Sequence, residues 1–482
     1  MFFSVHSVGT SILSIITVTV MILQFILEGY RWQMLPSNLT ACLFLIVTIG
    51  KINWPHPLFV VGWLLGGLSI GFTLITALGL PVIRWPKASG PYSVGTTTIE
   101  LTDGSRNETF ANGKGPRRLT IEAWYPALRD LNVNRASYLD PHDGIARALA
   151  KFLNLPSFVF THLSLIKTNS FIDAKILRKE GPFPVLIYSH GFYGYTKQNT
   201  VLIEELVSHG YIVLSISHPY ESLAVKFPSG RVVTYDEEWF IQSIEEDQRT
   251  KSLVNHYLKC HEMKEKEKLL KQIVENSPLA GKSLTIWTED TRFVIGQLQV
   301  LNDDPHCRLY QSIDYTKIGL FGFSFGGTTA TQVSMIDDRI RAGIDMDGLQ
   351  YGKLFGHSLS VPFMFMESSS FKGQNDPYYC KTKNNAYRVN VKKTGHFNFT
   401  DFSLLMPILK LFRFFEAKEN RRLGPIDGKR MICLTNDYIL SFFNVYLKGE
   451  DKTKLMRLSN QYPEAKMDMR SDLYSSSKNE SY

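Results

Sequence analysis

Cysteine is scarce in this chain of 482 residues, and it follows no metal-binding or disulfide pattern. The five cysteines stand at irregular spacing without a CxxC pair, at Cys42, Cys260, Cys307, Cys380 and Cys433. Structural zinc sites and disulfide frameworks both show recognisable cysteine spacings. We therefore expect neither a metal site nor a disulfide framework in this protein.

Blocks of basic residues are also lacking. Lysine and arginine number 53 against 45 acidic residues, which gives a formal net charge of +8. This excess is spread thinly along the chain, whereas nucleic-acid-binding proteins gather Lys and Arg on one face or in runs. Nucleic acid is therefore not an expected partner.

Charge is absent from most of the first 83 residues. Three runs carry no Asp, Glu, Lys or Arg, namely Met1–Leu27, Trp32–Gly50 and Pro55–Ile83. About 20 apolar residues suffice for a helix to cross a bilayer. The runs predict three transmembrane helices in a membrane module of residues 1–88, with buried core helices as the alternative. Because no span holds an ionisable Asp, Glu, Lys or Arg, a transporter or channel is not expected.

The few charges around these runs indicate an orientation. Three spans place Lys51 on one side of the membrane and Arg31, Arg84 and Lys87 on the other. Cytoplasmic segments are enriched in Lys and Arg, so the chain is expected to be a multi-pass protein of the cell membrane with its C-terminal domain in the cytoplasm. The two sides differ by two positive charges.

After residue 88 the pattern changes to that of an α/β domain. Short β-rich runs alternate with helical stretches, in the order PVLIYS, VLIEELVSHG, YIVLSISH, TEDTRFVIGQLQVL and KIGLFGFS. This alternation is typical of βαβ units, in which helices cover both faces of a mostly parallel sheet.

Three stretches depart from this rhythm. Residues 129–179 and 236–277 are too long for simple crossovers, and the second, which is charge-rich and helical, is a candidate cap over the sheet. The polar residues 464–482 are predicted to be a flexible tail. The catalytic domain is accordingly expected to span residues 89–463.

A serine flanked by glycines ends the last of these β-rich runs. Gly322-Phe323-Ser324-Phe325-Gly326 matches G-x-S-x-G and is followed by a helical stretch of small residues. A serine hydroxyl is a weak nucleophile, so it must be exposed on a tight bend where a base reaches it. Ser324 is the candidate nucleophile, and an ordinary glycine-rich turn is the alternative.

A second loop is placed to supply oxyanion donors. The run PVLIYS leads directly into His190-Gly191-Phe192. In hydrolases of this type, backbone amides of such a loop and of the residue after the nucleophile bind the oxyanion. The predicted donors are the amides of Phe192 and Phe325, whereas His190 is expected to have a structural role.

The base and the acid must follow the nucleophile in the sequence. His396 comes after a β-rich run and a glycine, which makes it the best-placed general base among twelve histidines. Several carboxylates end the intervening strands, and spacing does not choose among them: Asp345, Asp347, Glu367 and Asp376.

Four blocks of the sequence together carry a family resemblance: SHGFYGYTKQ, SHGYIVLSISHPY, GFSFGGTTATQVSMIDDRIRAGIDMDG and GHFNFTDF. In this order they resemble the plasma-type platelet-activating-factor acetylhydrolases and their bacterial relatives, over roughly residues 90 to 450. The N-terminal membrane helices are not part of the plasma enzyme.

The resemblance implies an α/β-hydrolase fold with Ser324, Asp347 and His396 as the triad and the amides of Phe192 and Phe325 as the oxyanion hole. It thereby favours Asp347 among the carboxylates. It also implies hydrolysis of short or oxidised acyl chains at the sn-2 position of phospholipids, without cofactor or metal. Phe323 stands where the plasma-type enzymes usually have histidine, and its side chain is expected to face away from the nucleophile.

The leading hypothesis is a membrane-anchored serine esterase or lipase that uses an acyl-enzyme, with a lipid or small ester as substrate and no obligatory protein partner. A general carboxylesterase, dienelactone-hydrolase-like or peptidase activity stays open, because fold does not fix function. A non-catalytic hydrolase-fold domain that binds a ligand at the membrane is the alternative from another class.

Overall fold

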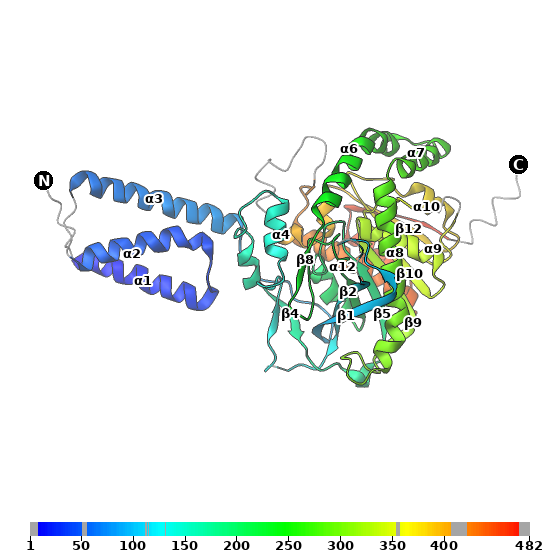
Figure 1. Ribbon diagram of the computed structural model, residues 1–482, viewed down its shortest axis with the longest axis horizontal. Coiled ribbons are helices and arrows are strands. Elements are labelled where there is room, and N and C mark those ends of the chain that lie inside the picture. Colours follow the sequence, from blue (N-terminus) through cyan, green and yellow to red (C-terminus); the bar gives the residue numbers. More distant parts are fainter. Residues whose placement is uncertain are drawn as a thin grey trace, which may run out of the picture.

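The computed structural model describes residues 8–50, 55–110, 113, 115–130, 132–352, 357–405 and 422–471. These residues form a group of three apolar helices that stands beside a larger α/β body (Figure 1). The three helices are α1 (Val8–Glu28), α2 (Leu35–Ile49) and α3 (His56–Gly79).

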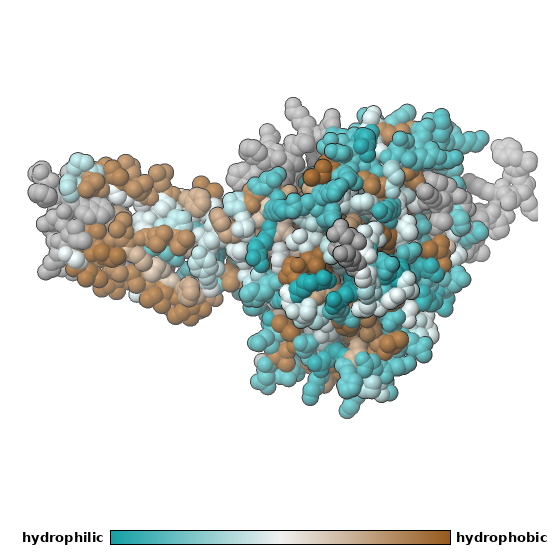
Figure 2. Space-filling view, in the orientation of Figure 1, coloured by the Kyte–Doolittle hydropathy of each residue, from teal (hydrophilic) through white to brown (hydrophobic). Residues whose placement is uncertain are grey.

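The prediction of three transmembrane helices is not supported. Among the described residues, two stretches are long and apolar enough to cross a bilayer, Trp32–Ile49 and Val60–Gly79. Within α1, the described residues give one shorter apolar stretch, Ile15–Glu28. The surface of this part is strongly hydrophobic (Figure 2), with Leu27, Leu68 and Leu78 exposed by 78%, 70% and 77%.

The segments before α2 and after α3 contact the α/β body. Trp32 donates its indole N–H to the carbonyl of Val159 over 3.1 Å. Beyond α3, Trp85 is 5% exposed and donates its indole N–H to Glu204 over 2.8 Å. The chain between α3 and the first strand therefore already packs on the body.

The body is built on one sheet that has eleven strands within the described residues, in the order β13-β12-β11-β10-β9-β5-β6-β2-β1-β4-β3. The six strands from β6 to β12 run parallel, as the alternating pattern predicts. The strands are β1 (Ser93–Asn107), β2 (Pro116–Ala127), β3 (Arg135–Ser137), β4 (Lys167–Ile172), β5 (Phe183–Ser189), β6 (Ile212–Ile216), β9 (Ile313–Phe323), β10 (Ile340–Met346), β11 (Phe363–Ser368), β12 (Ala386–Val391) and β13 (Ala465–Arg470). A separate hairpin joins β7 (Ala224–Lys226) and β8 (Val232–Thr234).

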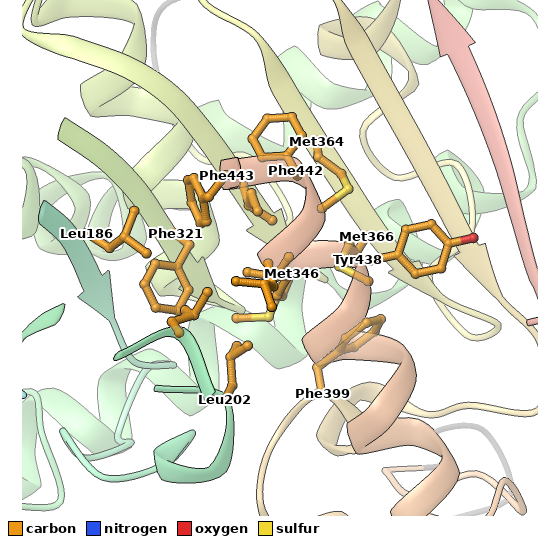
Figure 3. Close-up of a cluster of buried hydrophobic side chains, with 14 of the residues drawn as sticks. Leu186, Leu202, Phe321, Met346, Met364, Met366, Phe399, Tyr438, Phe442 and Phe443 are labelled. Carbon is orange, nitrogen blue, oxygen red and sulfur yellow. The ribbon is translucent and has the colours of Figure 1, made fainter. Parts of the chain in front are cut away.

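Helices cover both faces of this sheet because alternate strand residues point to opposite sides. Leu186 and Tyr188 of β5 belong to a core shared with α5 (Thr200–Ser208) and α12 (Gly428–Lys448), part of which is drawn in Figure 3. Val185 and Ile187 belong to a second core, shared with α8 (Pro278–Asp303) and α9 (Phe325–Ile336). A run apolar on both faces is what a central parallel strand requires.

The first insertion extends one edge of the sheet, and the second forms a pair of helices beside it. The first contains β3, α4 (Ile145–Phe152) and β4, together with short 3-10 turns. The second forms α6 (Glu237–Lys259) and α7 (Met263–Glu275), which pack on each other and lie beside α8 and α10 (Asp376–Lys381) (Figure 1). The α13 helix (Thr453–Gln461) completes the described helices of eight residues or more.

The prediction of a flexible tail from residue 464 is wrong at its start. Ala465–Arg470 form β13, which pairs antiparallel with β12 from Ala386 to Val391. Its alternation of Met467 and Met469 with charged residues suits an edge strand, since the two methionines pack against the core. Residues 472–482 lie outside the described part.

Candidate active site

The bend that carries Ser324 is built by glycines. β9 ends at Phe323, α9 begins at Phe325, and Ser324 between them has φ 55° and ψ −121°. A Cβ on Gly326 would lie 2.0 Å from the carbonyl oxygen of Ser189, and one on Gly322 would lie 2.2 Å from Gly326. Only glycine fits such approaches, so the motif predicted this strand, turn and helix correctly.

The three residues named as the triad meet at the carboxyl ends of the strands. His396 Nε2 lies 2.8 Å from Ser324 Oγ, and His396 Nδ1 lies 2.8 Å from Asp347 Oδ2. The Asp347 side chain is 0% exposed, whereas that of His396 is 23% exposed. A partly open imidazole between a hydroxyl and a buried carboxylate is the arrangement that activates a serine.

Asp347 is held in place from the neighbouring strand. It follows β10 with φ 62°, and its amide donates to the carbonyl of Met366 over 2.8 Å. Its Oδ1 accepts the amide of Ser368 over 2.7 Å, which leaves Oδ2 for the imidazole. A backbone held at positive φ for a non-glycine residue is typical of functional sites.

The other candidate carboxylates are engaged elsewhere. Asp345 is fully buried beneath the bend, where it accepts the amide of Gly348 over 2.8 Å, and burial holds its pKa well above the usual range. Glu367 accepts two backbone amides, and burial raises its pKa to about 7. Asp376 lies 3.0 Å from Lys266. None of these three contacts His396.

The histidine loop is fixed by a buried amide side chain. Asn398 is 0% exposed, and its Oδ1 accepts the amides of Gly395 over 2.8 Å and Gly424 over 2.7 Å. Its Nδ2 donates to Ser403 Oγ over 3.1 Å. These bonds tie the turn that carries His396 to two further segments.

Phe323, which is expected to face away from the nucleophile, packs against the candidate base. Its ring centroid lies 4.6 Å from that of His396, and its edge lies beside Gly191. Phe371 approaches the same imidazole at 5.5 Å. The residue before the nucleophile therefore packs against the candidate base, because β9 runs beside the loop from which the imidazole projects.

Phe192 and Phe325 bring two amides to the same end of the sheet. A Cβ on Gly191 would lie 3.3 Å from the Cβ of Ser324, so this loop passes directly beside the nucleophile. Phe325 is the first residue of α9, whose first amides have no acceptor within the helix. Among the described residues, the amide of Phe192 donates to no backbone carbonyl. The two amides stay the predicted oxyanion donors.

His190 is structural, as predicted. It is 0% exposed, and its ring nitrogens contact the carbonyl of Gly191 at 2.7 Å and Ser222 Oγ at 2.8 Å. Burial lowers its pKa to about 3. A histidine that stays neutral and holds its own loop does not serve as the base.

A buried charged network lies behind this loop, and no sequence motif predicted it. Arg117 pairs with Glu108 at 2.9 Å and with Asp290 at 2.7 Å, and all three are less than 10% exposed. Asp290 also lies 2.9 Å from His218 Nδ1. These residues come from separate parts of the chain, so no short sequence motif predicts that their side chains meet. In the described part of the chain, no group of three or more His, Cys, Asp or Glu residues is arranged to hold a metal ion.

Comparison with known proteins places this geometry in a family. The family model described as platelet-activating factor acetylhydrolase, isoform II, matches residues 80–460. Platelet-activating factor acetylhydrolase of Cavia porcellus is 27% identical over 388 residues, which cover 79% of this chain and 81% of the relative. A probable 1-alkyl-2-acetylglycerophosphocholine esterase of Arthroderma benhamiae is 23% identical over 79% of this chain and 92% of its own.

A solved structure supports the fold. The ferulic acid esterase of Streptomyces cinnamoneus superposes with a TM-score of 0.63 at 23% identity, over 80% of this chain and 99% of that esterase. Together with the parallel sheet and the serine bend, this likeness identifies an α/β-hydrolase fold. The chain belongs to the family described as platelet-activating factor acetylhydrolase, isoform II, and is a carboxylic ester hydrolase.

Proposed function

We propose that this chain is a membrane-anchored serine hydrolase that removes short or oxidised acyl chains from the sn-2 position of phospholipids. The observation that carries the proposal is the continuous contact from Ser324 through His396 to Asp347. The matching relatives include a platelet-activating factor acetylhydrolase and a probable 1-alkyl-2-acetylglycerophosphocholine esterase, and the second name describes a glycerophospholipid with an acetyl group at its second position.

In the proposed reaction, Ser324 Oγ attacks the ester carbonyl while His396 Nε2 takes the hydroxyl proton. Asp347 keeps the other imidazole nitrogen protonated and stabilises the positive charge that forms. The amides of Phe192 and Phe325 hold the oxyanion, and the imidazolium then gives its proton to the leaving alcohol. Water repeats these steps on the acyl-enzyme and releases the acid.

Comparing ester classes tests the substrate. We expect the purified full-length chain, in detergent, to cleave an sn-2 acetyl phospholipid with a kcat/KM at least about tenfold higher than that for a phospholipid with a long sn-2 chain. The reason is that one methylene changes kcat/KM about 10-fold in a fitted pocket. A peptide amide is expected to be inert. Equal cleavage of p-nitrophenyl acetate and of both phospholipids would favour a general carboxylesterase. Failure of a folded protein to cleave any ester would favour the binding module.

Membrane anchoring is proposed from α2 and α3. They would form a hairpin that leaves Arg31, Arg84 and Lys87 on the side of the hydrolase body, and basic residues on that side favour a cytoplasmic body. The apolar surface of these helices would then face lipid (Figure 2).

Extraction of membranes from expressing cells tests the anchor. The full-length chain is expected to stay in the pellet after alkaline carbonate treatment and to be released by detergent, because buried apolar helices do not leave a bilayer when charges are screened or titrated. Release of most of the protein by carbonate alone would contradict anchoring by spanning helices.

A further inference from the structure

The indole of Trp287 touches residues on both sides of the proposed oxyanion hole. Trp287 lies on α8 and is 0% exposed. Its ring centroid lies 5.0 Å from that of Phe325, with the rings perpendicular at 89°, and 6.1 Å from that of Phe192. The Phe192 and Phe325 rings lie 5.0 Å from each other. One rigid side chain therefore contacts the two residues whose amides are the proposed oxyanion donors.

Two further contacts stop the indole from turning. Its N–H donates to Glu221 Oε2 over 2.9 Å, and its plane stacks on the imidazole of His218 at 3.8 Å and 11°. Glu221 and His218 are both 0% exposed. A hydrogen bond at the edge of the ring and a stacked partner on its face leave one orientation.

The partners of the indole are themselves anchored. His218 Nδ1 lies 2.9 Å from Asp290, which is on α8 three residues after Trp287, and Asp290 pairs with Arg117 at 2.7 Å. Burial acts to raise the pKa of Asp290, but the guanidinium of Arg117 holds this pKa below its usual range. A buried, fully paired network of this kind is costly to rearrange.

Glu221 links the indole to the oxyanion loop directly. Its carboxylate accepts the indole N–H of Trp287 and the hydroxyl of Ser283, and its backbone carbonyl accepts the amide of Tyr193 over 3.0 Å. Tyr193 follows Phe192 in the chain. The same residue thus fixes the indole and the backbone next to one of the two amides.

We propose that Trp287 is a positioning residue that sets the separation of the Phe192 and Phe325 amides, with Glu221 and His218 holding it in place. This inference rests on the proposed function. Oxyanion donors act only within about 2.7–3.1 Å of the charged oxygen, and a displacement of about 1 Å costs roughly 10²-fold in rate. Because the indole touches no substrate atom in this role, it should affect kcat more than KM.

The test compares Trp287→Phe with Trp124→Phe in the full-length protein. Trp124 is 2% exposed in the core on the other side of the sheet, so its variant reports the general cost of shrinking a buried indole. Phenylalanine at 287 keeps one ring but leaves Glu221 without the indole donor. We expect kcat for p-nitrophenyl acetate to fall about 10- to 100-fold in Trp287→Phe, with KM within about threefold of the wild-type value. This loss is smaller than the roughly 10²–10³-fold loss that follows deletion of an oxyanion donor. Trp124→Phe should retain wild-type kcat.

Inhibitor binding separates positioning from loss of fold. An aryl trifluoromethyl ketone forms an oxyanion on the nucleophile, so its affinity should fall in Trp287→Phe by the same factor as kcat/KM. Unchanged kcat and inhibitor affinity in folded Trp287→Phe would overturn the proposal, as would an equal loss in Trp124→Phe. If Trp287→Phe does not fold, the same measurements are made on Glu221→Gln. The proposal expects its kcat to fall about 5- to 50-fold, and an unchanged kcat would overturn it. An inactive wild-type protein would instead refute the proposed function.

Discussion

Replacing Ser324 by alanine is expected to lower kcat/KM for an ester by about 10⁴- to 10⁶-fold, as losses of a triad nucleophile do. Nothing else in the described site can take over, because the hydroxyl of Ser324 is the one that contacts His396 Nε2, at 2.8 Å. Alanine is no worse than serine at the φ of 55° that the bend imposes, so the melting temperature should stay close to that of the wild type.

Ser334→Ala is the matched control for this variant. Ser334 lies on α9, the helix that follows Ser324, and is 3% exposed. Its hydroxyl has no hydrogen-bond partner among the described residues. Removing it should leave both activity and stability unchanged. A Ser324→Ala protein that keeps more than about a tenth of wild-type kcat/KM would rule out Ser324 as the nucleophile, since even single triad losses exceed this factor.

The second large effect concerns the acid. Asp347→Asn is expected to lower kcat about 10⁴-fold with the fold preserved, because an amide in place of Asp347 Oδ2 donates to His396 Nδ1 and forces the imidazole proton onto Nε2. That nitrogen then has no lone pair for the Ser324 proton. The measurement is kcat for a soluble ester alongside a thermal melt.

Asp376→Asn distinguishes this effect from the loss of any nearby carboxylate. Asp376 is one of the acids that spacing alone left open, but it pairs with Lys266 at 3.0 Å and with Arg388. Its loss should cost stability, because the side chain of Lys266 is 3% exposed and would lose its partner. It should leave kcat within about twofold, because Asp376 does not contact the imidazole. Loss of kcat in Asp376→Asn with activity kept in Asp347→Asn would reverse the assignment.

Local chemistry explains why much of the site was predictable. The bend at Ser324 needs glycines at fixed offsets and a strand before a helix, and all of these are visible in fifteen residues of sequence. The parallel strands were equally legible, because a strand buried on both faces is apolar throughout, as Phe183–Ser189 is. His396 followed from chain order and from the glycine before it.

Features that depend on contacts between distant segments were not predictable from such patterns. Asp345 and Asp347 are two residues apart, and only packing decides that one lies beneath the bend while the other meets the imidazole. The contact of Phe323 with His396 depends on where the histidine loop crosses β9. Strand β13 was missed because a polar edge strand resembles a tail until its partner is known.

The apolar N-terminus shows the limit of composition. Three uncharged runs suggested three spans, whereas the described residues contain two candidate spans, Trp32–Ile49 and Val60–Gly79. The network around Trp287 is a further case, since Glu221 lies 66 positions before Trp287 and His218 lies 72 positions before Asp290.

The most direct test of the central claim is to find where a fluorophosphonate bonds to the purified full-length protein, using peptide mass mapping. We expect a single adduct, on Ser324. In His396→Ala this adduct should form much more slowly, because the imidazole must take the hydroxyl proton as the oxygen–phosphorus bond forms. An adduct on another residue, or no adduct on folded protein, would contradict it.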